Sequence, residues 1–96
     1  MDNQLVLKAV LAEVQPLRYT PAGLPAIDLQ LAHESKQNEA GGVRQVKLST
    51  RAIAFGALAE RLARQAVGSS WRFRGFVAAG RNGKGLVFHI QDIQQD

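Results

Sequence analysis

The sequence predicts an all-β fold: a five-stranded barrel with one helix between the third and fourth strands. Five segments either alternate apolar and polar residues or are rich in Val, Leu and Ile, as expected of strands. Only the segment between the third and fourth of these places apolar residues four positions apart, which is the spacing of a helix. The length of 96 residues suits a single domain, which we expect to cover residues 1–96.

The first strand is expected over residues 3–14. Its polar residues alternate at the start and the remainder is apolar, which suits a long strand buried partly on each side. Pro16, Pro21 and Gly23 mark the loop that follows, because proline fixes φ and glycine permits positive φ. Such a long strand leaves backbone groups that a second copy can pair, so we expect a homodimer.

The second and third strands are separated by a polar segment. Residues 27–31 place three apolar residues on one face and Asp28 and Gln30 on the other. Residues 34–42 are polar and end in two glycines, so we expect a mobile hairpin loop. The third strand is expected over residues 43–52, where apolar and polar residues alternate again.

The helical pattern starts near Ile53 and is best between Ala57 and Val67. Three apolar residues share one face there: Leu58, Leu62 and Ala66. Gly68 is a natural stop, because glycine adopts the left-handed conformation that follows a last helical turn.

The fourth strand is expected over residues 70–79 and the fifth over 86–93, joined by a glycine-rich hairpin around Asn82-Gly83. Strand alternation assigns three aromatic residues to the core: Trp71, Phe73 and Phe88. Phe55, just before the helix, is expected to pack beneath it. Five strands with a helix between the third and fourth is the layout of the OB-fold, a partly open Greek-key barrel.

The composition excludes several classes of protein. Without cysteine there is no disulfide, thiolate zinc site or cysteine nucleophile. His33 and His89 have no catalytic or metal-ligand spacing, and Lys84 is followed by Gly85, which does not fit a phosphate-binding P-loop. No apolar stretch approaches the ~20 residues of a membrane helix, and no signal peptide is seen. We therefore expect a cytoplasmic, non-enzymatic protein without metal or cofactor.

Positive charge is concentrated in the second half of the chain. Between Arg44 and Lys84 there are nine basic residues and one acid, Glu60. A polyanion is therefore the first partner to consider. The basic residues expected on strands and loops that face single-stranded nucleic acid are Arg18, Arg44, Lys47, Arg51, Arg72, Arg74, Arg81 and Lys84. Arg61 and Arg64 lie on the helix and are assigned to solvent or to a protein partner.

Binding of single strands also needs flat surfaces on which bases stack. Tyr19, in the loop after the first strand, and Phe76, on the same face as Arg72 and Arg74, are the candidates. For each of these residues an ordinary packing or solvated role is the alternative.

Several segments resemble bacterial single-stranded DNA-binding proteins, namely residues 17–23 with 27–35, 55–60 and 68–75. Shorter segments, together with the chain length, resemble the primosomal replication protein N (PriB) family more specifically: Asn3–Leu7, Arg44-Gln45, Gly75–Val77 and Asn82-Gly83. The resemblance implies an OB-fold homodimer that binds single-stranded DNA, stimulates a replication-restart helicase and assembles with other primosome proteins. It also implies that basic residues at or beside Arg18, Arg44, Arg81 and Lys84 contact DNA.

The sequence departs from that family at three positions. Lys47 replaces a stacking Trp, Val43 replaces an aromatic residue, and Glu34 stands where a basic residue is common. We expect micromolar or weaker affinity with little sequence preference. Two alternatives stay open: a general single-stranded DNA-binding protein, although the expected acidic tail is not seen after residue 96, and a protein–protein adaptor with weak DNA binding.

Overall fold

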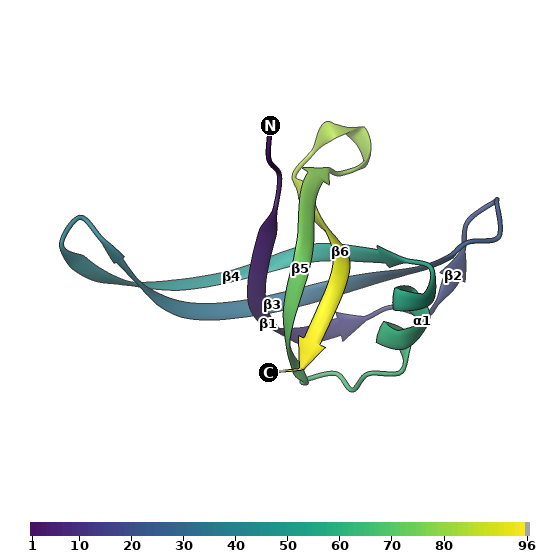
Figure 1. Cartoon of the computed structure of the whole chain (residues 1–96), viewed down its shortest axis with the longest axis horizontal. Coiled ribbons are helices and arrows are strands. Elements are labelled where there is room, and N and C mark those ends of the chain that lie inside the picture. The colour runs from purple at the N-terminus through teal and green to yellow at the C-terminus, as the bar shows by residue number, and fades with distance from the viewer. Residues whose placement is uncertain (96) are drawn as a thin grey trace.

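The structure is a computed structural model and describes residues 1–95 of the chain. Its elements, in order, are β1 (Leu5–Val14), β2 (Arg18–Tyr19), β3 (Pro25–Glu39), β4 (Gly42–Phe55), α1 (Ala57–Ala63), β5 (Ser70–Ala79), the 3-10 turn η1 (Arg81–Gly83) and β6 (Leu86–Gln95). The two-residue strand β2 lies within the predicted first loop. The other five strands and the helix follow the predicted order, which confirms the all-β fold class (Figure 1).

The sheet closes on itself to form a barrel. Its strand order is β1-β5-β6-β4-β3-β2, and β1 also pairs with β3. β1 contacts β5 from Leu5 to Val10 and then contacts β3 from Val10 to Val14, with a register shift between Leu11 and Glu13. The strand can serve both neighbours because this bulge bends it. β4 and β6 are parallel and pair over only three residues, 51–53 with 87–89.

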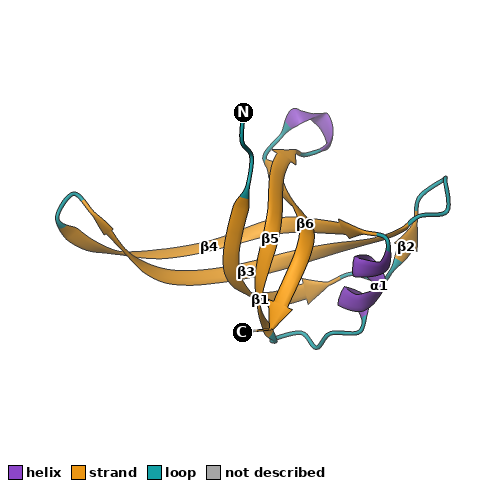
Figure 2. Cartoon of the chain, in the orientation of Figure 1, coloured by secondary structure: helices purple, strands orange, loops and turns teal. Residues whose placement is uncertain are grey.

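Apolar residues from every large strand and from the helix meet inside the barrel. Phe73, Phe88, Leu11, Leu31 and Leu62 are fully buried there. Burying a side chain of this size stabilises the fold by roughly 1.5–3 kcal/mol. The predicted core positions of Trp71, Phe73 and Phe88 are confirmed. α1 packs against β3 and β4 at one end of the barrel (Figure 2).

The polar segment over residues 34–42 is not the expected mobile loop. β3 and β4 stay paired out to Glu39 and Gly42, so they form a long ribbon that projects beyond the barrel (Figure 1). Ala40 and Gly41 make the turn with φ of +51° and +81°, as the tight turns of two-residue hairpins require. The prediction failed because the far end of the ribbon is exposed on both faces, so no apolar alternation marks its strands.

The helix is shorter than predicted. It begins at Ala57 rather than near Ile53, because β4 continues through Phe55, and it ends at Ala63 rather than near Val67. Past it, the Gly68 amide donates to the Leu11 carbonyl at 2.7 Å, and the Leu11 amide donates to the Ser69 carbonyl at 2.9 Å. These bonds tie the chain to β1 before another helical turn can form. Gly68 has φ of +95°, in agreement with its predicted role as a stop.

Among residues 1–95, no helix is long and apolar enough to cross a membrane. Nor does that range bring together three or more His, Cys, Asp or Glu side chains that could hold a metal ion.

Candidate nucleic-acid interface

A groove of about 720 Å³ runs along the outer face of β4 and β6. One wall comes from β2 and the start of β3, and the other comes from the β5–β6 connection. Three predicted cations and one predicted stacking residue line it together: Arg18, Arg51, Arg81 and Tyr19. Phe55 and His89, which the sequence did not single out as binding residues, also line it. The groove thus combines positively charged side chains with exposed aromatic rings.

Arg18 is held in this groove by Asp28. The Arg18 Nε donates to Asp28 Oδ2 at 2.7 Å, and its Nη2 donates to Oδ1 at 3.3 Å. The hydrogen bond first, and then the negative charge of Asp28, raise the pKa of Arg18 above its ordinary value. The two side chains are 43% and 47% exposed, so the guanidinium is charged, oriented and still accessible to a ligand.

Arg51 reaches across the groove to the β5–β6 connection. Its Nη2 donates to the Lys84 carbonyl at 3.4 Å, beside Gly80. A Cβ on Gly80 would lie 2.6 Å from that Nη2 and 2.8 Å from the Lys84 carbonyl oxygen. The lack of a side chain at Gly80 therefore leaves room for the hydrogen bond between Arg51 and Lys84. This bond holds Arg51 against the connection that carries Arg81 and Lys84.

An aromatic row crosses β5, β6 and β4. Phe76 stacks on His89 with ring centroids 4.8 Å apart, and Phe55 lies beyond His89 at 6.3 Å. Phe55 is 41% exposed and does not pack beneath α1, so that prediction is wrong. The reason is the alternation of β4, in which Ala52 and Ala54 face the core and Phe55 faces the groove side. Exposed rings of this kind can stack on nucleobases.

The cations Arg72 and Arg74 lie outside the groove, on the exposed face of β5. They precede Phe76 at two-residue intervals, so they share its face of the strand. Arg74 lies 3.7 Å from Asp92, its direct partner on β6. This face extends from the aromatic row away from the groove, which agrees with the predicted grouping of Phe76 with both arginines.

The cations Arg44 and Lys47 lie on the β3–β4 ribbon and do not line the groove. Arg44 is 3.5 Å from Glu39, and Lys47 is 3.2 Å from Glu34. The structure therefore divides the predicted binding residues between the groove, the outer face of β5 and the ribbon.

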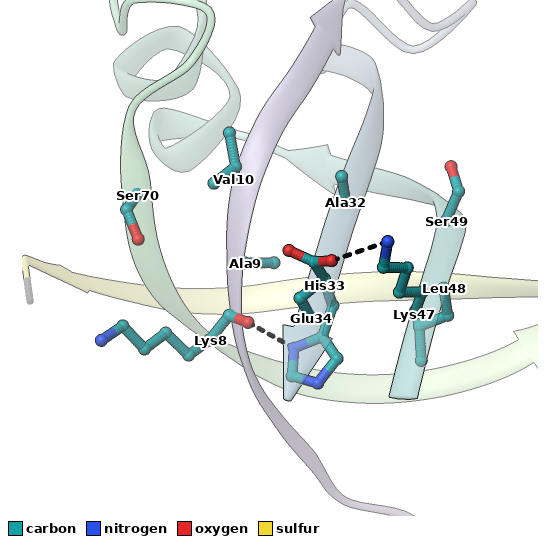
Figure 3. Close-up of a pocket in the computed structure, with 10 residues that line it drawn as sticks. All are labelled: Lys8, Ala9, Val10, Ala32, His33, Glu34, Lys47, Leu48, Ser49 and Ser70. Carbon is teal, nitrogen blue, oxygen red and sulfur yellow. Dashed lines mark hydrogen bonds and ion pairs between the residues drawn. The ribbon is translucent and has the colours of Figure 1, made fainter. Parts of the chain in front are cut away.

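Lys47 instead lines a second cavity, of about 770 Å³, between β1, β3 and β4 (Figure 3). Here His33 Nδ1 is 2.6 Å from the Lys8 carbonyl, and Nε2 is 2.8 Å from Ser35 Oγ. His33 therefore bridges β3 and β1 where the two strands diverge.

Known proteins resemble this chain in both sequence and fold. A family model described as another single-strand binding protein family matches residues 3–92. The replication restart protein PriB of Bordetella pertussis is 42% identical over 94 residues, covering 97% of this chain and 88% of its own. The chain belongs to the PriB family.

Solved structures agree with membership of the PriB family. PriB of Ralstonia solanacearum superposes with a TM-score of 0.90 at 39% identity, covering 99% of this chain and 98% of its own. A deletion mutant of the single-stranded DNA-binding protein of Thermus aquaticus superposes with a TM-score of 0.75 at 26% identity, covering 96% of this chain and 49% of its own. The barrel is therefore an OB-fold, as predicted, and it matches the fold of a solved PriB structure.

Proposed function

We propose that this chain is a non-enzymatic, single-stranded DNA-binding component of the replication-restart primosome. The observation that carries the proposal is the groove, where Arg18, Arg51 and Arg81 surround exposed aromatic side chains. Phosphate-tracking cations beside stacking surfaces are the combination that single-strand binding requires. Relatives named replication restart protein PriB support the primosomal role.

In this proposal the backbone phosphates run along the arginines and the bases face the rings. Tyr19 is 64% exposed and Phe55 is 41% exposed, so each can offer a face to a base without unfolding the barrel. Stacking accepts every base, because each base has a π face, so the groove should show little sequence preference. Lys84 beside the groove, Arg72, Arg74 and Phe76 on β5, and Arg44 and Lys47 on the ribbon would contact the flanking nucleotides.

The edge of β1 supports the proposed homodimer. On one side Leu5, Val6 and Leu7 pair with β5, whereas on the other side pairing with β3 begins only at Val10. A second copy can add a strand to such an open edge. We place the dimer in the cytoplasm, as one domain per chain without a cofactor, where it would act on the restart helicase and other primosome proteins.

The deciding experiment titrates labelled oligo(dT) with the protein at two salt concentrations, with and without a restart helicase. We expect weak binding to single strands and faster unwinding by the helicase. About four to six phosphate contacts predict a log–log salt slope of about −3 to −4. Binding without stimulation would favour a general single-strand binder, and stimulation without measurable binding would favour an adaptor.

A further inference from the structure

Half of the candidate DNA-binding cations already contact a carboxylate of the same chain. The four pairs, with their closest N–O distances, are Arg18–Asp28 at 2.7 Å, Lys47–Glu34 at 3.2 Å, Arg44–Glu39 at 3.5 Å and Arg74–Asp92 at 3.7 Å. Within residues 1–95, the other four candidates have no such ion pair: Arg51, Arg72, Arg81 and Lys84. Carboxylates of the chain therefore pair with some of the candidate cations and leave the others free of ion pairs within residues 1–95.

Two of these four pairs follow directly from strand register. Glu34 is the direct partner of Lys47, and Arg74 is the direct partner of Asp92. Cross-strand neighbours of opposite charge meet in this way without any change of backbone. All eight side chains are at least 39% exposed, and exposed pairs of this kind contribute little to stability. Their larger effect is on what else the cations can bind.

Arg18 and Asp28 are the pair that lies inside the groove, since both side chains line it. Asp28 occupies the Nε and one Nη of the guanidinium, which together form one of the edges suited to a bidentate phosphate contact. A phosphate that takes this edge must displace the carboxylate. A phosphate that takes another edge of Arg18 stays close to the negative charge of Asp28 and is repelled by it.

We propose that Asp28 competes with DNA phosphate for Arg18 and sets the single-strand affinity of the groove below what its arginines alone would give. This inference rests on the proposed function. When phosphate displaces Asp28, the carboxylate returns to solvent and takes up a counterion from solution. Phosphate binding at Arg18 therefore releases fewer ions overall than binding at an unpaired arginine such as Arg81.

The experiment compares Asp28→Asn with wild type in titrations of labelled oligo(dT). Asparagine keeps the shape and one acceptor oxygen but removes the charge. We expect binding to tighten by about three- to tenfold at low salt, as the loss of one nearby repulsive charge predicts. The log–log salt slope should steepen by up to about 0.7.

Glu60→Gln is the matched control. It makes the same change in net charge, but Glu60 is on α1 and does not line the groove. We expect it to change affinity by less than about twofold, because exposed charges at a distance are screened by salt. Equal gains in both variants would mean that only net charge matters, and would overturn the inference.

A double-mutant cycle tests whether Asp28 acts through Arg18. In an Arg18→Ala background the gain from Asp28→Asn should shrink, because the contested guanidinium is gone. Weaker binding by the single variant Asp28→Asn would show that Asp28 positions Arg18 for DNA, which would overturn competition. Wild-type protein that fails to bind oligo(dT) at low salt would instead refute the proposed function itself.

Discussion

Phe76 and His89 lie opposite each other on β5 and β6, and their rings stack with centroids 4.8 Å apart and planes 13° apart. Gly75 makes this approach possible, because any Cβ there would overlap the His89 carbonyl oxygen at 1.8 Å. The close contact of the two backbones fixes His89 at the groove, between Phe76 and Phe55. A backbone requirement at one residue thus sets the position of the aromatic row.

Replacing Gly75 should destabilise the fold. Gly75→Ala forces β5 and β6 apart, since its Cβ meets backbone rather than a flexible side chain. We expect a loss of about 1–3 kcal/mol in the free energy of unfolding, as for other overpacked sites. Urea denaturation measures it, with Gly42→Ala as control, because a Cβ at Gly42 lies 3.8 Å from its nearest neighbour. Equal stabilities of the two variants would contradict the assigned role of Gly75.

Removing the exposed ring of Phe55 should weaken DNA binding and spare the fold. Loss of one stacked base costs about 1–3 kcal/mol of binding free energy. We expect Phe55→Ala to lower the affinity for oligo(dT) accordingly while the melting temperature changes little, because the side chain is half-exposed. Val67→Ala is the control, since it shortens an exposed apolar side chain that does not line the groove. Unchanged affinity in Phe55→Ala would remove Phe55 from the interface.

Arg51→Ala should have two effects. Loss of its contact with the Lys84 carbonyl should speed hydrogen exchange in residues 80–85. Loss of one phosphate contact should make the salt slope shallower by about 0.7. Arg64→Ala should do neither, because Arg64 is the C-cap of α1 and does not line the groove. Slower exchange, or a slope that stays the same, would show that Arg51 does not act as described.

The open edge of β1 predicts the mass of the particle in solution. Sedimentation equilibrium at micromolar concentration should give twice the mass of the 10.4 kDa chain. A monomer mass at that concentration would mean that the edge at Leu5–Leu7 stays open and that the homodimer proposal is wrong.

Strand alternation was sufficient to predict the core. Trp71 and Phe73 lie two positions apart in a strand with Arg72 between them, so their burial follows from local spacing alone. The ribbon could not be predicted in the same way. Its residues pair through the backbone while both faces meet solvent, and such pairing leaves no apolar pattern.

The groove depended on contacts between distant segments. His89 contacts Phe55 because β6 pairs with β4 in parallel over three residues. No local sequence motif predicts this pairing. The ion pair of Arg18 with Asp28 likewise arises from the two-residue strand β2, which falls inside a predicted loop. The cations could be named from charge alone, but their partners could not.

The most direct test of a DNA-binding groove removes two positive charges from the groove in one variant and two from the helix and its C-cap in another. Arg51→Ala/Arg81→Ala and Arg61→Ala/Arg64→Ala lower the net charge equally, but only the first pair lines the groove. Titration with labelled oligo(dT) at two salt concentrations should show weaker binding and a salt slope shallower by about 1.4 for the groove variant. The helix variant should match wild type. Equal losses in the two variants, or a greater loss in the helix variant, would contradict a DNA-binding groove on β4 and β6.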